Sequence, residues 1–295
     1  MLMGAREEPY LGAVLESLRD AVDVLVVNDN SGQEKSSNRR TLEESALFRK
    51  EQVEIVEAPF DGFANARNRC LENIRQRYSD KAWILVVDCD EVHGAQLPHL
   101  TREVAPALPT RVGVVDGYFV QFMQSFDYFI SLDRRHNLMF RLTPEARWEC
   151  DVHEQLQGLH GTRLCLPYVY YHYGYVMPNS QILDKWQQYQ SLGDGSLNRD
   201  ELAGADLLRM FEHEVPRCMP YSWGHPPTMK SHLQQPADAA VTLFKQMCAE
   251  RLHQPVPWMV SVLRRLNYRL RVFWRALQAF PMAPRVWGTL LRMAL

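Results

Sequence analysis

Residues 83–91 read Trp-Ile-Leu-Val-Val-Asp-Cys-Asp-Glu, an apolar run that stops at three carboxylates within four residues. A run this short and β-branched, bounded by acids, predicts a fully buried strand of a parallel sheet with Asp88 and Asp90 at its carboxyl end. Ligands of open α/β sheets bind at that edge. Because clustered acids repel one another, a cation usually compensates them, and Mg²⁺ or Mn²⁺ bridging a substrate diphosphate is the natural candidate. An isolated Asp-x-Asp can also be a solvated turn, so the surrounding sequence must decide.

The chain before this run alternates between predicted strands and helices. The expected strands are 1–5, 22–27 and 53–56, and the expected helices lie around 11–18, 42–50 and 63–74. Three strand-helix alternations favour a right-handed, mainly parallel sheet. The second strand runs into the polar loop 28–32, so its end meets the acidic run at one sheet edge.

Composition is that of a globular protein, with 46% hydrophobic and 23% charged residues in a chain of 295. Six scattered cysteines without a Cys-x-x-Cys pair suggest reduced cytosolic thiols rather than a zinc site or a disulfide framework. No signal peptide opens the sequence, and no uncharged apolar run approaches the roughly 18 residues of a membrane-spanning helix. A cytoplasmic protein is therefore expected.

Three motifs of the chain resemble those of the family-2 glycosyltransferases of the GT-A fold and occur in the same order. They are Asn-Asp-Asn-Ser-Gly at 28–32, Phe-Ala-Asn-Ala-Arg-Asn at 63–68 and the acidic run at 83–91. The resembling subgroup makes bacterial surface polysaccharide and lipopolysaccharide. Three ordered motifs are far more specific than one.

The resemblance continues to about residue 192. Phe140-Arg141 and Val152-His153-Glu154 are similar to a later block of the subgroup, and a strand containing His172 precedes a helix with Lys185 and Tyr189. The subgroup usually has aspartate where this chain has Asn28, which leaves Asp29 as the acid of that motif.

The resemblance implies an α/β, Rossmann-like GT-A fold with a mainly parallel central sheet flanked by helices and a C-terminal helical extension. The expected catalytic domain is 1–178, with a nucleotide-sugar half at 1–110 and an acceptor half at 111–178. A helical extension at 179–250 and a basic amphipathic tail at 251–295 follow.

The resemblance also implies how a nucleotide-sugar donor and a metal are held. Asp90 is the main expected ligand of Mn²⁺ or Mg²⁺, Asp88 lies nearer the ribose or sugar and shares the ion, and His172 contacts the metal or diphosphate. The ordinary alternative for His172 is a hydrogen-bonded structural histidine in an aromatic strand.

Further donor contacts are expected from the loops at the same sheet edge. The candidates are Ala5, Arg6 and Glu7 for the base, Asp29 for the base or ribose, and Arg67 for the nucleotide or diphosphate. Asp29 could instead be an Asx-turn residue, and Arg67 could be a surface arginine covering its helix.

An inverting transfer needs a base for the acceptor hydroxyl. Glu154 is the candidate, with His153 beside it to orient it or to contact phosphate, and Glu91 is the main rival. The predicted activity is a metal-dependent, inverting transfer of a sugar to a glycan or lipid-linked acceptor.

The tail from Arg251 carries eight Arg and no Asp or Glu. Its apolar residues share one helical face from Met259 onward, which is typical of a helix lying on an anionic membrane surface. We expect such contact through 258–295, which would place the enzyme peripherally on the inner face of the cytoplasmic membrane. The alternative is a helix docked on the acidic body of the protein.

The sequence is also compatible with two other function classes. Residues 86–92 also resemble the nucleophile loop of haloacid-dehalogenase-like phosphatases, but that family needs the loop near the start of the fold and a later acidic pair. A non-catalytic carbohydrate-binding or membrane-surface protein with a degenerate site is the second alternative. No nucleic-acid partner is expected, because the basic residues lie in an apolar helix.

Overall fold

The computed structural model describes residues 1–4, 6–32, 36–78, 82–150, 154–193, 206–234 and 238–252. Two predicted site residues, Ala5 and His153, lie outside these ranges, as does most of the basic tail predicted at 251–295.

The first part of the chain builds a small parallel sheet covered by helices. Its strands are β1 (Leu2–Met3), β2 (Leu25–Asp29) and β3 (Val53–Glu57), in the order β1-β2-β3. The helices are α1 (Leu11–Leu18), α2 (Ser37–Glu43), α3 (Ala46–Arg49) and α4 (Phe63–Arg77). The apolar face predicted for the first helix is buried in α1, as expected from its spacing.

The helix predicted around 42–50 is two short helices. Ser36 and Ser45 each accept a hydrogen bond from a backbone N–H three residues ahead, and so cap α2 and α3. The single helix predicted at 63–74 is confirmed as α4. Gly62 precedes it with φ 113°, a left-handed value that favours glycine, and this turn directs the first residues of α4 toward the site.

The second part of the chain builds a mixed sheet. Its strands follow the order β11-β7-β6-β10-β5, with β4 also paired to β7. Their bounds are Trp83–Leu85 for β4, Glu91–Val92 for β5, Val112–Met123 for β6, Ser125–Arg141 for β7, Thr162–His172 for β10 and Met219–Pro220 for β11. Only β6 and β10 pair in parallel in this sheet. Its core includes Phe122, Phe129, Tyr168 and Tyr170.

Several short elements complete this region. They are α5 (Leu97–His99), the π-turn η1 (Leu100–Val104), α6 (Ala105–Ala107) and the antiparallel pair β8 (Arg147–Glu149) and β9 (Gln155–Gln157).

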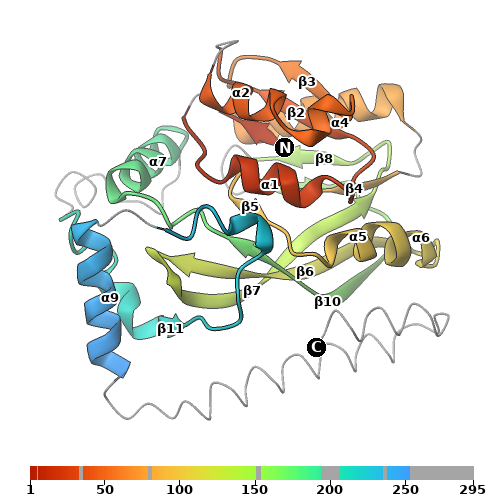
Figure 1. The fold of residues 1–295 in the computed structure, drawn as a ribbon. Coiled ribbons are helices and arrows are strands. Elements are labelled where there is room, and N and C mark those ends of the chain that lie inside the picture. Colours follow the sequence, from red (N-terminus) through yellow and green to blue (C-terminus); the bar gives the residue numbers. More distant parts are fainter. Residues whose placement is uncertain are drawn as a thin grey trace.

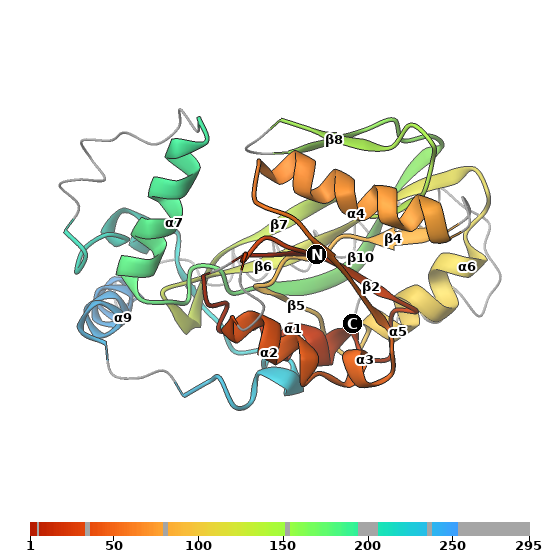
Figure 2. The same cartoon turned by 90° about the horizontal axis from the view of Figure 1, so that it is seen from above.

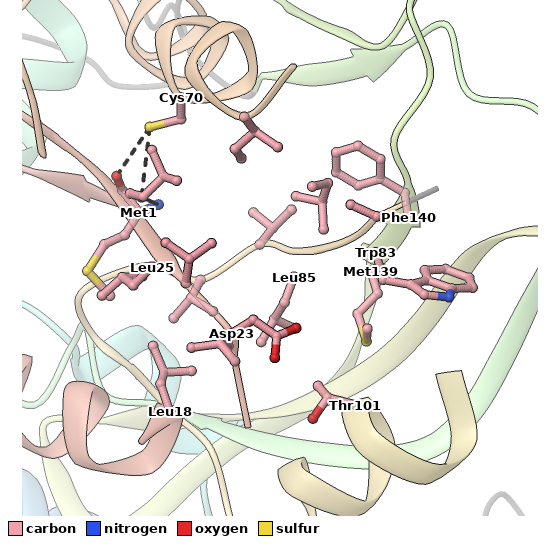
Figure 3. Close-up of a pocket in the computed structure, with 18 of the residues that line it drawn as sticks. Met1, Leu18, Asp23, Leu25, Cys70, Trp83, Leu85, Thr101, Met139 and Phe140 are labelled. Carbon is pink, nitrogen blue, oxygen red and sulfur yellow. Dashed lines mark hydrogen bonds between the residues drawn. The ribbon is translucent and has the colours of Figure 1, made fainter. Parts of the chain in front are cut away.

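The strand predicted at the acidic run differs from expectation. β4 is short and half-buried, and it pairs antiparallel with β7 rather than in parallel. β4 does not pair with β1, because an apolar cavity of about 480 Å³ separates β1 from residues 83–87. Figure 3 shows its wall, with Met1 and Leu25 facing Leu85 and Met139 across the space. Parallel pairing thus occurs within β1–β3 and between β6 and β10. The strand predicted at the acidic run, β4, does not belong to a parallel pair.

At one end of the molecule lie α7 (Asn179–Ser191), the 3₁₀ helix η2 (Glu212–Arg217) and α9 (Ala239–Leu252). The short 3₁₀ helix η3 (Pro227–Met229) packs against α1 instead, with Met229 in the main core. Figures 1 and 2 show α7 and α9 at the end opposite α5 and α6. A second apolar cluster, including Ile182, Phe211 and Phe244, packs α7, η2 and α9 together. Among the described residues, no helix has the length and apolar character needed to cross a membrane.

Candidate functional site

A polar cavity of about 510 Å³ lies where the N-terminal sheet, α4, β10 and α7 meet. Eight acidic or basic side chains line it, contributed by segments far apart in the chain: Arg6, Glu8, Arg67, Asp88, Asp90, Glu154, His172 and Lys185. Phe60, Phe63 and Tyr189 add aromatic surface to the same wall. The cavity therefore joins the acidic run to residues from both halves of the predicted catalytic domain.

Asp90 is the most enclosed carboxylate of this cavity, with 7% of the residue exposed. Its Oδ1 lies 3.4 Å from Nε2 of His172, and its Oδ2 lies 3.3 Å from Nζ of Lys185. Burial alone would raise the pKa of Asp90, but the pairing with His172 and Lys185 holds that pKa far below its usual range. Asp90 is therefore held as an anion, with the ammonium of Lys185 at one oxygen and the imidazole of His172 facing the other.

Gln121 fixes the orientation of His172. The Gln121 amide donates through Nε2 to the Phe122 carbonyl, so its Oε1 faces Nδ1 of His172 at 2.8 Å. Nδ1 must then carry the proton in a neutral imidazole, which leaves the Nε2 lone pair directed at Asp90. Two acceptors that face each other at 3.4 Å need a proton or a cation between them.

The donor set fits a hard divalent ion that arrives with a phosphorylated ligand. Asp90 and His172 offer one oxygen and one nitrogen side by side, and Asp88 lines the same cavity. Among the described residues, no three His, Cys, Asp or Glu side chains are grouped closely enough to hold a metal by themselves. Mg²⁺ typically uses one or two carboxylates and takes its other ligands from water and substrate phosphates, so this partial set is suitable.

Arg67 connects the acidic run to Glu154. Its Nη2 donates to Asp88 Oδ1 at 2.9 Å and its Nε donates to Glu154 Oε1 at 2.8 Å. Burial would raise the pKa of Asp88, but Arg67 and Arg135 lower it to about 2. The guanidinium also lies 5.1 Å from the centre of the Trp148 ring. Arg67 is thus buried in the site and is not a surface arginine.

Glu154 and its rival Glu91 have different surroundings. Glu154 lines the cavity with 16% of its side chain exposed. Glu91 is 3% exposed, and both of its oxygens are already used by Tyr170 OH and the Asp88 N–H. Burial raises the pKa of Glu91. Of the two, Glu154 is the carboxylate that a ligand in the cavity can reach.

Asp29 lies beside the cavity wall rather than on it, whereas its neighbour Asn30 lines the cavity. Asp29 Oδ1 accepts from the Ser31 N–H at 2.9 Å, which is the Asx-turn arrangement, and Oδ2 pairs with Arg39 at 3.4 Å. Asn28 is fully buried and its amide donates to the Val56 carbonyl. The asparagine that departs from the subgroup thus links β2 to β3.

The loop after β1 presents Arg6 and Glu8 to the cavity, while Glu7 is exposed and does not line it. Arg6 and Glu8 form an ion pair at 2.9 Å. Burial and the nearby Asp90 raise the pKa of Glu8.

Asn38 of α2 holds this loop. Its Nδ2 donates to the carbonyls of Gly4 and Arg6 at 2.9 and 2.7 Å, and its Oδ1 accepts from the Glu8 N–H at 2.9 Å. The sequence offered no signal for Asn38 or for Gln121, because neither belongs to a recognised motif and each acts only through tertiary contacts. Glu8 directly follows the predicted residues 5–7, but no sequence pattern distinguishes it from Glu7.

The sequence model of the family described as Glycosyl transferase family 2 matches residues 5–163. This range contains Arg67, Asp88, Asp90 and Glu154, and it ends before His172 and Lys185. A search of curated proteins finds no match to the chain.

Proposed function

The chain belongs to glycosyltransferase family 2, and we propose that it is a metal-dependent, inverting enzyme that moves a sugar from a nucleotide-sugar donor to a glycan or lipid-linked acceptor. The observation that carries the proposal is Arg67, which contacts Asp88 and Glu154 in the cavity that also contains Asp90 and His172. One cavity thereby offers a place for a leaving diphosphate and a base for an acceptor.

The donor's diphosphate is proposed to lie over Asp90 and His172. A Mn²⁺ or Mg²⁺ ion held there would neutralise the charge that develops on the leaving diphosphate. Arg6, in the loop after β1, is suitably placed for the nucleotide, together with Ala5, which lies outside the described residues. Asp29 can reach a base or ribose only if its pairing with Arg39 is exchanged for the ligand.

Glu154 is proposed to take the proton of the acceptor hydroxyl. Its Oε1 accepts from Arg67 at 2.8 Å, which fixes the direction of the carboxylate. The second oxygen remains to accept the hydroxyl proton as the new glycosidic bond forms. His153 adjoins Glu154 in the sequence and keeps its proposed role of orienting it.

The acceptor class and the cellular location extend the proposal further. A lipid-linked sugar or a lipopolysaccharide core would suit an enzyme whose basic segment 258–295 contacts an anionic membrane surface from the cytoplasmic side. The proposed division is a catalytic domain at 1–178, a helical extension at 179–250 and the basic tail at 251–295. Family membership gives no support to the phosphatase alternative. A non-catalytic binding protein with a degenerate site would show no increase of Tm with any donor in the experiment below.

A thermal-shift panel tests this function. The full chain is heated with UDP-, GDP- and dTDP-sugars, each with Mn²⁺ and each with EDTA. At least one donor should raise Tm only when Mn²⁺ is present, and Asp90→Asn should remove that increase. An equal increase in EDTA would refute the metal-dependent mechanism, and no increase with any donor would favour a non-catalytic protein.

A further inference from the structure

Helix α7 presents one face to the polar cavity. Lys185, Gln188 and Tyr189 occupy positions i, i+3 and i+4, which lie on the same side of a helix, and all three line the cavity. Lys185 is 13% exposed, and its Nζ lies 3.3 Å from Asp90 Oδ2 and 6.0 Å from the centre of the Tyr189 ring. A lysine so enclosed needs a specific partner, and here the partner is Asp90.

This pairing conflicts with the proposed metal site. The ammonium of Lys185 and a divalent ion both require the carboxylate of Asp90, and their positive charges repel at such short range. When an ion binds, the ammonium has to move.

The cavity provides a place for it. The lysine side chain is a flexible four-carbon stem with a point charge at its end, and it can swing without moving the helix. Since Lys185 and Asp90 both line the cavity, a diphosphate coordinated to an ion on Asp90 would lie within reach of the displaced ammonium.

We propose that Lys185 is a mobile cation of this site: it neutralises Asp90 when no donor is bound, and it transfers to the donor's diphosphate when the divalent ion takes Asp90. The inference deepens the proposed function and rests on it. Its consequence is that the metal alone binds against competition from Lys185, whereas the metal bound to a diphosphate gains a favourable contact with Lys185. Removing the charge should therefore shift the two affinities in opposite directions.

The experiment compares two probes on the full-length protein: Mn²⁺ alone, followed by the loss of the free-ion EPR signal, and the preformed 1:1 Mn²⁺–pyrophosphate complex, followed by calorimetry. In Lys185→Met, Mn²⁺ alone should bind about tenfold more tightly and the complex about tenfold more weakly. A shift of both affinities in the same direction, or no shift in either, would overturn the proposal.

Variants separate this outcome from misfolding. Lys185→Gln should reproduce the opposed shifts if Lys185→Met fails to fold, while Lys185→Arg, which keeps the charge, should stay within about threefold of the native protein for both probes. Lys50→Met removes an exposed lysine that is also paired with a carboxylate, Asp20, and should change neither affinity.

The same titrations distinguish the failure of this inference from the failure of the proposed function. If native protein binds neither probe, or if Asp90→Asn binds both as well as native protein, the metal site itself is wrong. If Asp90→Asn weakens both probes but Lys185→Met changes neither, only the mobile role of Lys185 is wrong.

Discussion

Gly174 leaves no room for a side chain beside Asp90: a Cβ at this position would clash with Asp90 Oδ2 and would lie 2.8 Å from His172 Nε2. Contacts that short do not occur in folded proteins, so any larger residue must displace the carboxylate, the imidazole or both. The close approach of the two proposed metal ligands thus depends on a glycine two residues after His172.

Gly174→Ala should therefore damage the metal site more than the fold. We expect affinity for the Mn²⁺–pyrophosphate complex to fall at least about tenfold, because the ligands can no longer approach as they do now. Gly94→Ala is the matched control, since its Cβ would meet only the Tyr171 ring at 3.8 Å. Calorimetry on both variants checks the prediction, and equal affinities would contradict it.

Glu154→Gln should separate donor binding from transfer. The amide keeps the shape of the side chain but cannot take a proton, so kcat should fall by about 10²–10⁴ while KM for the donor changes little. Glu149→Gln, an exposed glutamate paired with Arg147 on β8, should retain normal turnover. Steady-state kinetics test the assignment, and normal kcat in Glu154→Gln would move the base to another residue.

Asn38→Ala should loosen the loop after β1. Two backbone carbonyls and one N–H would lose their partner, which should cost about 2 kcal/mol of unfolding free energy and raise KM for the donor more than it lowers kcat. Asn65→Ala, which removes an exposed side chain bonded to the Asp61 carbonyl, serves as the control. Urea unfolding and donor kinetics are the measurements. An unchanged KM would show that the loop does not contact the donor.

Asp88 should make stability depend on pH. Its pKa is about 2 in the folded protein, below its ordinary value near 4, because Arg67 and Arg135 favour the charged form over the effect of burial. The group therefore stabilises the fold above pH 4, and this contribution is lost as pH falls toward 2. Asp88→Asn should cost about 1 kcal/mol at pH 6 and progressively less below pH 4.

Urea unfolding of native protein and Asp88→Asn at pH 6, 5, 4 and 3 measures this difference. If the difference in unfolding free energy between the two proteins grew as the pH fell, the assigned direction of the Asp88 pKa would be contradicted. As the control, Asp20→Asn changes an exposed carboxylate, and its unfolding free energy should stay close to that of native protein at every pH.

Much of the fold follows from local pattern. The apolar spacing of α1, the strand at β3 and the helix α4 with Arg67 in its first turns were all predictable, because each is determined by residues close in sequence. The strand that pairs with the acidic strand β4 was not predictable in this way. Periodicity identifies an apolar strand but not the direction of its neighbour, and β4 pairs antiparallel with β7 while a cavity separates it from β1.

The site likewise contains residues that the sequence motifs predict and contacts that they do not. Asp88, Asp90, Arg67 and Glu154 belong to ordered motifs, and they meet in one cavity. The contact of Lys185 with Asp90 joins residues 95 positions apart, and the hydrogen bond of Gln121 to His172 spans 51. No local signal encodes such pairs, so only the tertiary structure identifies them.

The central claim is that Asp90 holds a divalent ion against the diphosphate of an activated sugar. The direct measurement is the hydrolysis of UDP-, GDP- and dTDP-sugars, in which water takes the sugar and nucleoside diphosphate is released, with Mn²⁺ and with EDTA, by native protein and by Asp90→Asn. We predict Mn²⁺-dependent release from at least one donor and a decrease of at least about 100-fold in Asp90→Asn. Release that proceeds equally in EDTA, or that survives in Asp90→Asn at the native rate, would contradict the claim.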